Sequence, residues 1–441
     1  MPNLAPKCRT ALLVAVSTLA ACHSPDAAGV ANHQQASLAQ PSATKYGLLV
    51  YRGLQAFRVP AHGPRQVSAD NTGSFGLSWS KSTNVALDLL TQLVAERVAL
   101  TSATTAAERV ADVLSTLEGL RTFRGLFPEF IKLDGPAQAE VKAGTIRYST
   151  IDSAWVTVAL SIAQARYREA RPELAQRAQA LIERQDYASF VVSNLLSSGT
   201  SIDAQSGASV EPGRFSYGDR NSEARPLVLA LIGLGLLPPA VWDSMSYSWT
   251  ERAGLAVADG YRMSAFVELT GQLFFDEMAL APQSLGLSHR NYAEATARIA
   301  LAKQHVVWGY APSCEPPDRY AEFGLDRPDV VTPYAAAELA TTGQLLARQN
   351  LTRVLEALDY SGPVADALDP VNALGVCTSA RMLDQSLLFL ALYPEALRNL
   401  ARASSWYASA EARLRDMDRT HRPPATSAPR AAELGVRRVG G

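Results

Sequence analysis

The chain has 441 residues, of which 47% are hydrophobic and only 7% aromatic, and its formal net charge is −1. This length is sufficient for a large core, and the even charge argues against nucleic acid or an acidic polymer as a partner. The composition therefore predicts a globular protein that does not bind nucleic acid.

The first 21 residues have the pattern of a secretion signal. Lys7 and Arg9 precede an apolar stretch, 11–21, and these are the two sections of a signal peptide. The stretch ends in Leu19-Ala-Ala-Cys22, which resembles the lipobox of bacterial lipoproteins, where the cysteine becomes the lipidated first residue. Position 23 is His and not Asp, which by resemblance to Gram-negative sorting rules favours the outer membrane. An ordinary signal peptide with a chance cysteine is the alternative.

The segments on either side of the main domain are predicted to be unstructured. Residues 22–45 are rich in Ala, Ser, Gln and Pro and have the composition of a flexible tether. The tail 419–441 contains three prolines, and we expect it to be disordered. No second apolar run is both long enough and free enough of charge to span a bilayer. We therefore expect one domain, 46–418, held at the cell envelope by a lipid at Cys22.

Helical periodicity dominates the chain from Tyr46 onward, after a short apolar alternation at 48–59 that indicates a small strand or an extended segment. Thr105-Ala-Ala-Glu108 has the pattern of a capping box, and Thr332-Pro333 is a firm helix start. The predicted helices are 84–100, 105–120, 149–162, 172–181, 226–237, 264–280, 290–304, 333–347, 350–359, 381–393 and 394–407.

Roughly a dozen helices and no convincing sheet predict an all-α fold. Long loops rich in Gly, Pro and aromatic residues alternate with short ones; the long loops are 121–148, 199–221, 305–331 and 360–380. The absence of an exact repeat period disfavours a solenoid. Paired helices with long loops gathered at one end instead suggest an (α/α)6 toroid, in which six helical hairpins form a ring. We expect this domain to be a monomer.

The stretch Tyr217-Gly-Asp-Arg-Asn-Ser-Glu-Ala-Arg225 stands directly before the apolar run 227–237. Pro226 fits the first position of the helix that follows, because a missing N–H costs nothing there. The stretch is then a loop that holds a carboxylate and an arginine on a rigid base. The alternative is that Ser222 and Glu223 only cap the helix and Arg225 pairs at the surface.

The sequence lacks a P-loop, a dinucleotide-binding turn, a nucleophile elbow and a paired-histidine zinc motif, so no metal or organic cofactor is predicted. Its loops instead place carboxylates next to aromatic residues, the composition of a carbohydrate cleft. Alternatives exist for two of the acids, because Asp152 has the position of a capping acid and Asp384 could serve the helix dipole. The residues of these acid–aromatic groups are Asp152, Trp155, Tyr217, Glu223, Trp308, Tyr310, Tyr320 and Asp384.

At these residues the chain resembles the glucoamylase-like family, which includes β-1,2-glucanases and the related domain of cyclic β-1,2-glucan synthases. The stretch Tyr217–Arg225 looks like the family motif, and the likeness covers about 75–392. The other matching motifs are Ser82-Thr-Asn84, Tyr148-Ser-Thr-Ile-Asp-Ser-Ala-Trp155, Phe274-Phe-Asp-Glu277, Ala281-Pro-Gln-Ser-Leu-Gly-Leu287, Trp308-Gly-Tyr-Ala-Pro-Ser313, Tyr320-Ala-Glu-Phe-Gly324, Val330-Val-Thr-Pro-Tyr-Ala335 and Leu383-Asp-Gln-Ser386.

The resemblance implies an α/α toroid and glycan hydrolysis by carboxylates without a metal or an organic cofactor. Glu223 falls on the glutamate of the motif, Asp152 on an upstream aspartate and Asp384 on a late aspartate. One departure concerns Val267, which stands on a family glutamate, while Glu268 is one residue further. One residue is about 100° of helix rotation, so we expect that Glu268 either turns away from the cleft or requires a local shift of the helix.

The leading hypothesis is an envelope lipoprotein that hydrolyses a β-glucan, with β-1,2-glucan favoured. Glu223 is the candidate general acid and Asp384 the candidate general base. The predicted substrate-binding residues are Asp152, Trp155, Tyr217, Arg225, Glu268, Trp308, Tyr310 and Tyr320. Two alternatives are a glycan-binding lipoprotein without turnover and a transglycosylase. Cys314 and Cys377 lie in loops that approach the proposed site, so we expect them close together; a bridge requires Cα atoms within about 7 Å.

Overall fold

The computed structural model describes residues 40–62, 65–73, 76–316 and 318–423. The predicted signal 1–21, the lipidation site Cys22 and most of the tether lie outside the described residues, and so does most of the tail. The first helix begins at Gln40, before the expected domain start at 46, and the last helix ends at Thr420, beyond the expected end at 418. The compact unit itself begins at Pro41.

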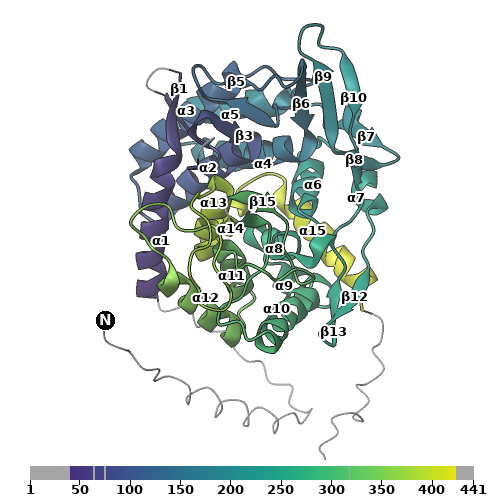
Figure 1. Ribbon diagram of the computed structural model, residues 1–441. Coiled ribbons are helices and arrows are strands. Elements are labelled where there is room, and N and C mark those ends of the chain that lie inside the picture. Colours follow the sequence, from purple (N-terminus) through teal and green to yellow (C-terminus); the bar gives the residue numbers. More distant parts are fainter. Residues whose placement is uncertain (1–39, 63–64, 74–75, 317, 424–441) are drawn as a thin grey trace, which may run out of the picture. The chain divides into compact units, whose positions relative to one another are not determined.

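Fifteen helices make up about half of the described chain, as Figure 1 illustrates. They are α1 (Gln40–Leu54), α2 (Ser82–Arg97), α3 (Ala103–Gly119), α4 (Thr150–Tyr167), α5 (Pro172–Glu183), α6 (Ala224–Gly233), α7 (Ala240–Ser244), α8 (Ala265–Phe274), α9 (Glu277–Leu280), α10 (Leu285–Ala302), α11 (Pro333–Ala340), α12 (Leu345–Ala357), α13 (Met382–Leu392), α14 (Pro394–Arg402) and α15 (Tyr407–Thr420).

Six of these helices close an inner ring. Helices α2, α4, α6, α8, α11 and α13 each contact the next in this order, and α13 contacts α2. Each is buried over nearly its whole length, since the ring interior covers one side and outer helices cover the other. Helices α3, α5 and α12 belong to this outer layer, because they pack on α2, α4 and α11, respectively. The prediction of an α/α toroid is confirmed.

The C-terminal helices α14 and α15 cover the inner ring in positions that a pattern of consecutive hairpins does not predict. Helix α15 packs against α6, where the chain itself supplies only the short α7 and a β-hairpin before α8. Helix α14 contacts α2, α4 and α8 and covers their C-terminal ends. The Arg398 guanidinium donates to the carbonyl of Gln272 in the last turn of α8, at 2.8 and 3.0 Å. A buried cation thus satisfies a carbonyl of a helix C-terminus.

The expectation of no sheet is wrong, because the described segments between the helices contain short strands that pair with one another in six small antiparallel sheets. Pairing satisfies the backbone hydrogen-bonding groups of these segments. The strands are β1 (Arg58–His62), β2 (Arg65–Ser68), β3 (Trp79–Lys81), β4 (Phe130–Lys132), β5 (Gln138–Ala139), β6 (Thr145–Ser149), β7 (Val191–Val192), β8 (Leu195–Ser197), β9 (Gly199–Asp203), β10 (Ser209–Pro212), β11 (Ser216–Tyr217), β12 (Trp249–Arg252), β13 (Leu255–Ala258), β14 (Ser313–Glu315) and β15 (Arg319–Ala321).

Three local predictions also need correction. Helix α6 begins at Ala224 and not at Pro226, so Glu223 stands at the N-cap position. Helix α3 is capped by the Ser102 hydroxyl, which accepts from the Thr105 amide, and Thr105 itself is helical. Most of 48–59 is helical because α1 runs to Leu54. Within the described residues, no helix is long and apolar enough to span a bilayer.

Cys314 and Cys377 form a disulfide with their Cα atoms 6.4 Å apart, which confirms that they lie close together. The bridge joins the β14–β15 hairpin to the segment that leads into α13. Beside it, the Asp318 carboxylate accepts hydrogen bonds from the amides of Thr378 and Ser379 at 3.0 and 2.9 Å. Hydrogen bonds from Thr378 and Ser379 lower the pKa of Asp318 to about 2. Two loops far apart in sequence are therefore fixed together at the mouth of the ring.

Candidate active site

A cavity of about 630 Å³ opens at the N-terminal ends of α6 and α8. Most of its lining is aromatic or aliphatic, and carboxyl groups stand among these side chains. A shallow apolar surface with a few acids suits a sugar, whose ring has both C–H faces and hydroxyl edges. The side chains that define it include Phe215, Tyr217, Asp219, Glu223, Tyr261, Phe266, Val267, Tyr320 and Glu322.

Glu223 is at the N-cap of α6, but its side chain does not cap the helix. The carboxyl group lines the cavity instead. Burial and the negative charge of Asp152 raise the pKa of Glu223 to about 7, although Lys81 acts in the opposite direction. A glutamic acid with a pKa of about 7 keeps its proton in about half of the molecules at pH 7, so it can act as a proton donor there.

Asp384 lies in the first turn of α13 and is 3% exposed. The Ser313 hydroxyl donates to its Oδ2 at 2.8 Å, while Oδ1 has no partner among the described residues. Burial, outweighing Arg381 and Ser313, raises the pKa of Asp384 to about 7, and the charge of Asp70 contributes. Oδ1 is thus the oxygen that can accept a hydrogen bond from a water molecule or a hydroxyl group.

A second buried acid, Asp366, stands beside Asp384. Burial, followed by the charge of Asp384, raises the pKa of Asp366 well above its usual range, even though the Arg381 guanidinium is 3.4 Å away. Two neighbouring carboxyl groups in a dry site cannot both ionise easily. The protonation of one carboxyl group therefore affects the other, and of the two it is Asp384 that has an oxygen without a partner among the described residues.

Tyr320 links the two acids. It lies on β15, its side chain is 56% exposed, and it lines the same cavity as Glu223. Desolvation of its hydroxyl, and then the charges of Asp384 and Glu223, raise the pKa of Tyr320. The structure therefore brings Glu223, Asp384 and Tyr320 together at one end of the ring, and Tyr217 joins them on the cavity wall.

Asp152 belongs to the same group of side chains, on the α4 side. The Thr83 hydroxyl at the start of α2 donates to Asp152 Oδ1 at 2.6 Å. The Asp152 amide is capped by Ser149 at 3.2 Å, so the capping position predicted for it is also correct. Its carboxylate acts on Glu223 through space, because its charge favours the protonated form of the glutamic acid.

Three aromatic residues predicted to bind substrate lie in the core, which corrects the prediction. Trp155 is 1% exposed and packs on Phe274, with ring centroids 5.6 Å apart. Trp308 is 4% exposed, and Tyr310 is fully buried and hydrogen-bonded to His305 at 2.8 Å. Helical periodicity around Trp155 was consistent with a core position, and the loop residues Trp308 and Tyr310 pack beneath the mouth rather than in it.

Arg225 and Glu268 are also buried and do not reach the cavity. Arg225 is 0% exposed and pairs with Glu277 at 2.8 Å, so the expectation that it contacts substrate is corrected. Its guanidinium also donates to the carbonyl of Glu268 at 2.7 Å. Glu268 is 1% exposed and turns inward, while Val267 occupies the cavity wall. The one-residue offset predicted from the helix rotation is therefore present.

These charges form one buried network around His289. The imidazole Nδ1 lies 2.9 Å from Glu268 Oε1, and Nε2 lies 2.9 Å from Glu277 Oε2. Burial alone would lower the pKa of His289, but the hydrogen bonds to the two carboxylates raise it. Asn221 joins the Glu223 loop to the network, since its amide donates to Glu268 at 2.8 Å and its carbonyl accepts from Arg225 at 3.0 Å.

Sequence reasoning missed several residues of the cavity. Tyr261 and Glu322 form a hydrogen-bonded pair at the rim, and the Tyr261 side chain is 62% exposed. Phe215 is 55% exposed and packs edge-on against Tyr217. Burial raises the pKa of Asp219, a third acid of the cavity, to about 6. Asp219 and Phe215 stand within or next to the stretch singled out above, so proximity to Glu223 was the one available signal.

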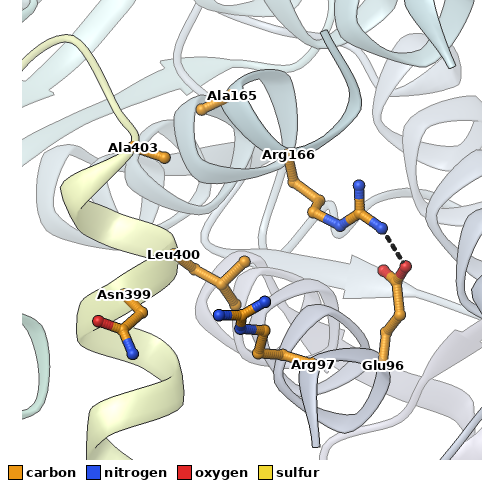
Figure 2. A pocket seen from close by; sticks show the side chains of 7 residues that line it. All are labelled: Glu96, Arg97, Ala165, Arg166, Asn399, Leu400 and Ala403. Carbon is orange, nitrogen blue, oxygen red and sulfur yellow. Dashed lines mark hydrogen bonds and ion pairs between the residues drawn. The ribbon is translucent and has the colours of Figure 1, made fainter. Parts of the chain in front are cut away.

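Figure 2 shows a second cavity, of about 550 Å³, at the opposite ends of the inner helices. It lies between the last turns of α2 and α4 and the side of α14. Its one carboxylate, Glu96, is paired with Arg166, as the dashed line marks. A paired carboxylate is neither a proton donor nor a free base, so this cavity does not have the chemistry of the first.

No protein-family model and no curated protein matches this sequence. Solved structures do match. An endo-β-1,2-glucanase from Chitinophaga pinensis, in complex with sophorotriose and glucose, has 13% identity, a TM-score of 0.70 and coverage of 85% of this chain and 97% of its own. The endo-β-1,2-glucanase from Talaromyces funiculosus with sophorose has 14% identity, a TM-score of 0.69 and coverage of 86% and 90%. A candidate glucoamylase from Bacteroides fragilis has 15% identity, a TM-score of 0.71 and coverage of 89% of this chain and 99% of its own. The chain shares the fold of these three proteins.

Replacing Arg225 tests whether it is a structural or a substrate-binding residue. Arg225→Met leaves Glu277 buried without its main cation, and breaking such a pair costs about 3–5 kcal/mol. We expect the free energy of unfolding, measured in urea, to fall by that amount. Arg419→Met, which removes an exposed arginine from its pair with Asp416, should change stability by less than about 0.5 kcal/mol. An Arg225→Met protein of unchanged stability with a raised KM would favour substrate contact instead.

Proposed function

We propose that this protein is a glycoside hydrolase that cleaves β-glucan, and that β-1,2-linked glucan is its substrate. The observation that carries the proposal is the pair Glu223 and Asp384. Both carboxyl groups stand at the mouth of one α/α toroid, both have a pKa raised to about 7, and Tyr320 lies close to both. A pair of carboxyl groups is the catalytic apparatus of most glycoside hydrolases.

The chemistry assigns one role to each acid. Glu223 donates its proton to the glycosidic oxygen as the bond to the anomeric carbon breaks. Asp384 accepts a proton from the attacking water through Oδ1, so that a hydroxyl group is added to the anomeric carbon. The products are two shorter glucans, and the proton taken by Asp384 returns to Glu223 through solvent. The charge of Asp152 favours the protonated form of Glu223.

The choice of linkage is supported by the solved structures of similar fold. Two of them are named endo-β-1,2-glucanases and were solved with sophorose or sophorotriose. A Glu-to-Gln variant of the Talaromyces enzyme was solved with β-1,2-glucan. To test the proposal, the purified domain is incubated with β-1,2-, β-1,3-, β-1,4- and β-1,6-glucans, and the products are separated by chain length. Shortened chains from β-1,2-glucan alone are the expected result.

Removing either carboxyl group should abolish most of the turnover. Glu223→Gln and Asp384→Asn preserve shape but remove the proton donor and the base, so each should lower kcat by on the order of a hundredfold or more. KM should change little, because the ring contacts to the sugar remain. Glu294→Gln, at an exposed position of α10, is the matched control and should retain full activity. Either variant with wild-type kcat on a substrate that the wild type cleaves would contradict the assignment.

The pH dependence follows from the two raised pKa values. The general acid Glu223 must be protonated, so activity is lost as pH rises through its pKa of about 7. The general base Asp384 must be ionised, so activity is lost as pH falls through its own pKa of about 7. We expect a narrow bell in kcat/KM with a maximum near pH 7. Ordinary pKa values would instead place the optimum near about pH 4, and that outcome would refute the role of burial.

We also propose that the protein is anchored to the bacterial envelope by lipid on Cys22, with the outer membrane as the favoured location. The support is the signal pattern that ends in Leu19-Ala-Ala-Cys22. Cys22→Ala should leave a protein that no longer fractionates with membranes, because a multiply acylated cysteine is needed for stable attachment. Cys8→Ala, in the same leader, is the matched control and should fractionate normally. Membrane association of Cys22→Ala equal to wild type would reject the anchor.

A further inference from the structure

A second aromatic surface flanks the catalytic acids, on strands β3 and β4. In this antiparallel pair Trp79 is opposite Lys132, and Lys81 is opposite Phe130. Side chains alternate along a strand, so these four residues share one face of the sheet. Ser80 and Ile131, on the other face, are fully buried. Trp79 and Phe130 are only partly buried, which leaves aromatic surface open to solvent.

This face lines a cavity of about 300 Å³. Trp79 and Phe130 supply its apolar surface, and Asp70, Glu140 and Lys142 supply charged and hydrogen-bonding groups around it. The Lys81 ammonium lies 5.0 Å from the centroid of the Phe130 ring. Aromatic faces beside acids are common to this lining and to that of the first cavity, and they suit a neutral ligand with apolar faces and many hydroxyl groups.

Both acids of the proposed pair lie near this β3–β4 cavity. Lys81, on the same face of the sheet as Trp79, is close enough to Glu223 for its charge to lower the pKa of that acid. The charge of Asp70, which lines the β3–β4 cavity, acts on Asp384 and raises its pKa. The Asp70 carbonyl accepts from the Met382 amide at 2.8 Å, so the wall of this cavity is tied to the first residue of α13. The β3–β4 cavity shares no lining residue with the cavity that Glu223 lines.

We propose that Trp79 and Phe130 form a second sugar-binding platform, so that a glucan chain crosses the catalytic pair from the Tyr217–Tyr261 cavity to this one. The ligand is a glucosyl unit, on the opposite side of the cleaved bond from the unit held by Tyr217 and Tyr261. This inference rests on the proposed function.

The test measures binding and length dependence separately. β-1,2-Linked gluco-oligosaccharides of increasing length are titrated by calorimetry into Glu223→Gln and into Glu223→Gln with Trp79→Ala. The variant without the indole should bind the longer oligosaccharides on the order of tenfold more weakly and the shortest ones equally well. In the active enzyme, Trp79→Ala should lower kcat/KM by a similar factor for long chains only. Trp79→Phe, which keeps a ring, should recover most of both.

Tyr360→Ala is the matched control, since it removes a half-buried aromatic that packs on Tyr46 away from both cavities. It should leave binding and length dependence unchanged, and thermal unfolding of each variant checks that it is folded. Equal affinities of the two Glu223→Gln proteins for every length would overturn the platform while the hydrolase proposal stands. An equal loss at every length would also overturn it. A wild-type protein that neither binds nor cleaves β-1,2-glucan would overturn the proposed function, and the platform with it.

Discussion

The buried guanidinium of Arg225 holds together the segments on which the site is built. It donates hydrogen bonds to Glu277, the first residue of α9, to the carbonyl of Glu268 in α8 and to Asn221 in the loop that carries Glu223. The carboxyl groups of Glu268 and Glu277 also face the two ring nitrogens of His289, and these hydrogen bonds raise the pKa of the imidazole. Losing any one partner would leave an uncompensated charge in the core, and that cost fixes the loop in a single conformation.

A rigid frame of this kind permits the two acids of the proposed site, Glu223 and Asp384, to be held in an unfavourable environment. A helix N-terminus stabilises a carboxylate by about 0.3–1 kcal/mol and should lower its pKa. The pKa of Glu223 nevertheless rises from 4.5 to about 7, which corresponds to roughly 3 kcal/mol in the opposite direction. Desolvation and Asp152 therefore outweigh the helix dipole. At Asp384 in α13, burial likewise raises the pKa by more than the charge of Arg381 lowers it.

The sequence was a good guide to the ring, and a poor guide to which aromatic residues face the cavity. Helix starts such as Pro333 depend on local chemistry and are predictable from a few residues. Local chemistry also singles out the two proposed acids, because Glu223 stands in a polar stretch just before α6 and Asp384 lies in the first turn of the apolar helix α13. Trp155 and Tyr310 were misjudged because whether an aromatic ring lines a cavity or the core depends on the ring closure, which no local pattern contains. The short strands between the helices and the position of α15 against α6 also depend on long-range packing, so a local pattern does not predict them.

The mouth of the ring combines loops that are fixed in place with an aromatic lining that suits a sugar. This combination affects how the proposed catalytic acids would be positioned. The Cys314–Cys377 bridge and the hydrogen bonds of Asp318 tie the Tyr320 hairpin to the segment before Asp384. The buried network around Arg225 likewise holds the loop that carries Glu223 in place. Neither acid then has to be positioned by the substrate, so binding energy from the aromatic surfaces is available to orient the glycosidic bond between them. Val267 gives the cavity an apolar wall at a position where a glutamate would add a charge. Glu268, one residue further, points into the core instead and is the hydrogen-bonding partner of His289.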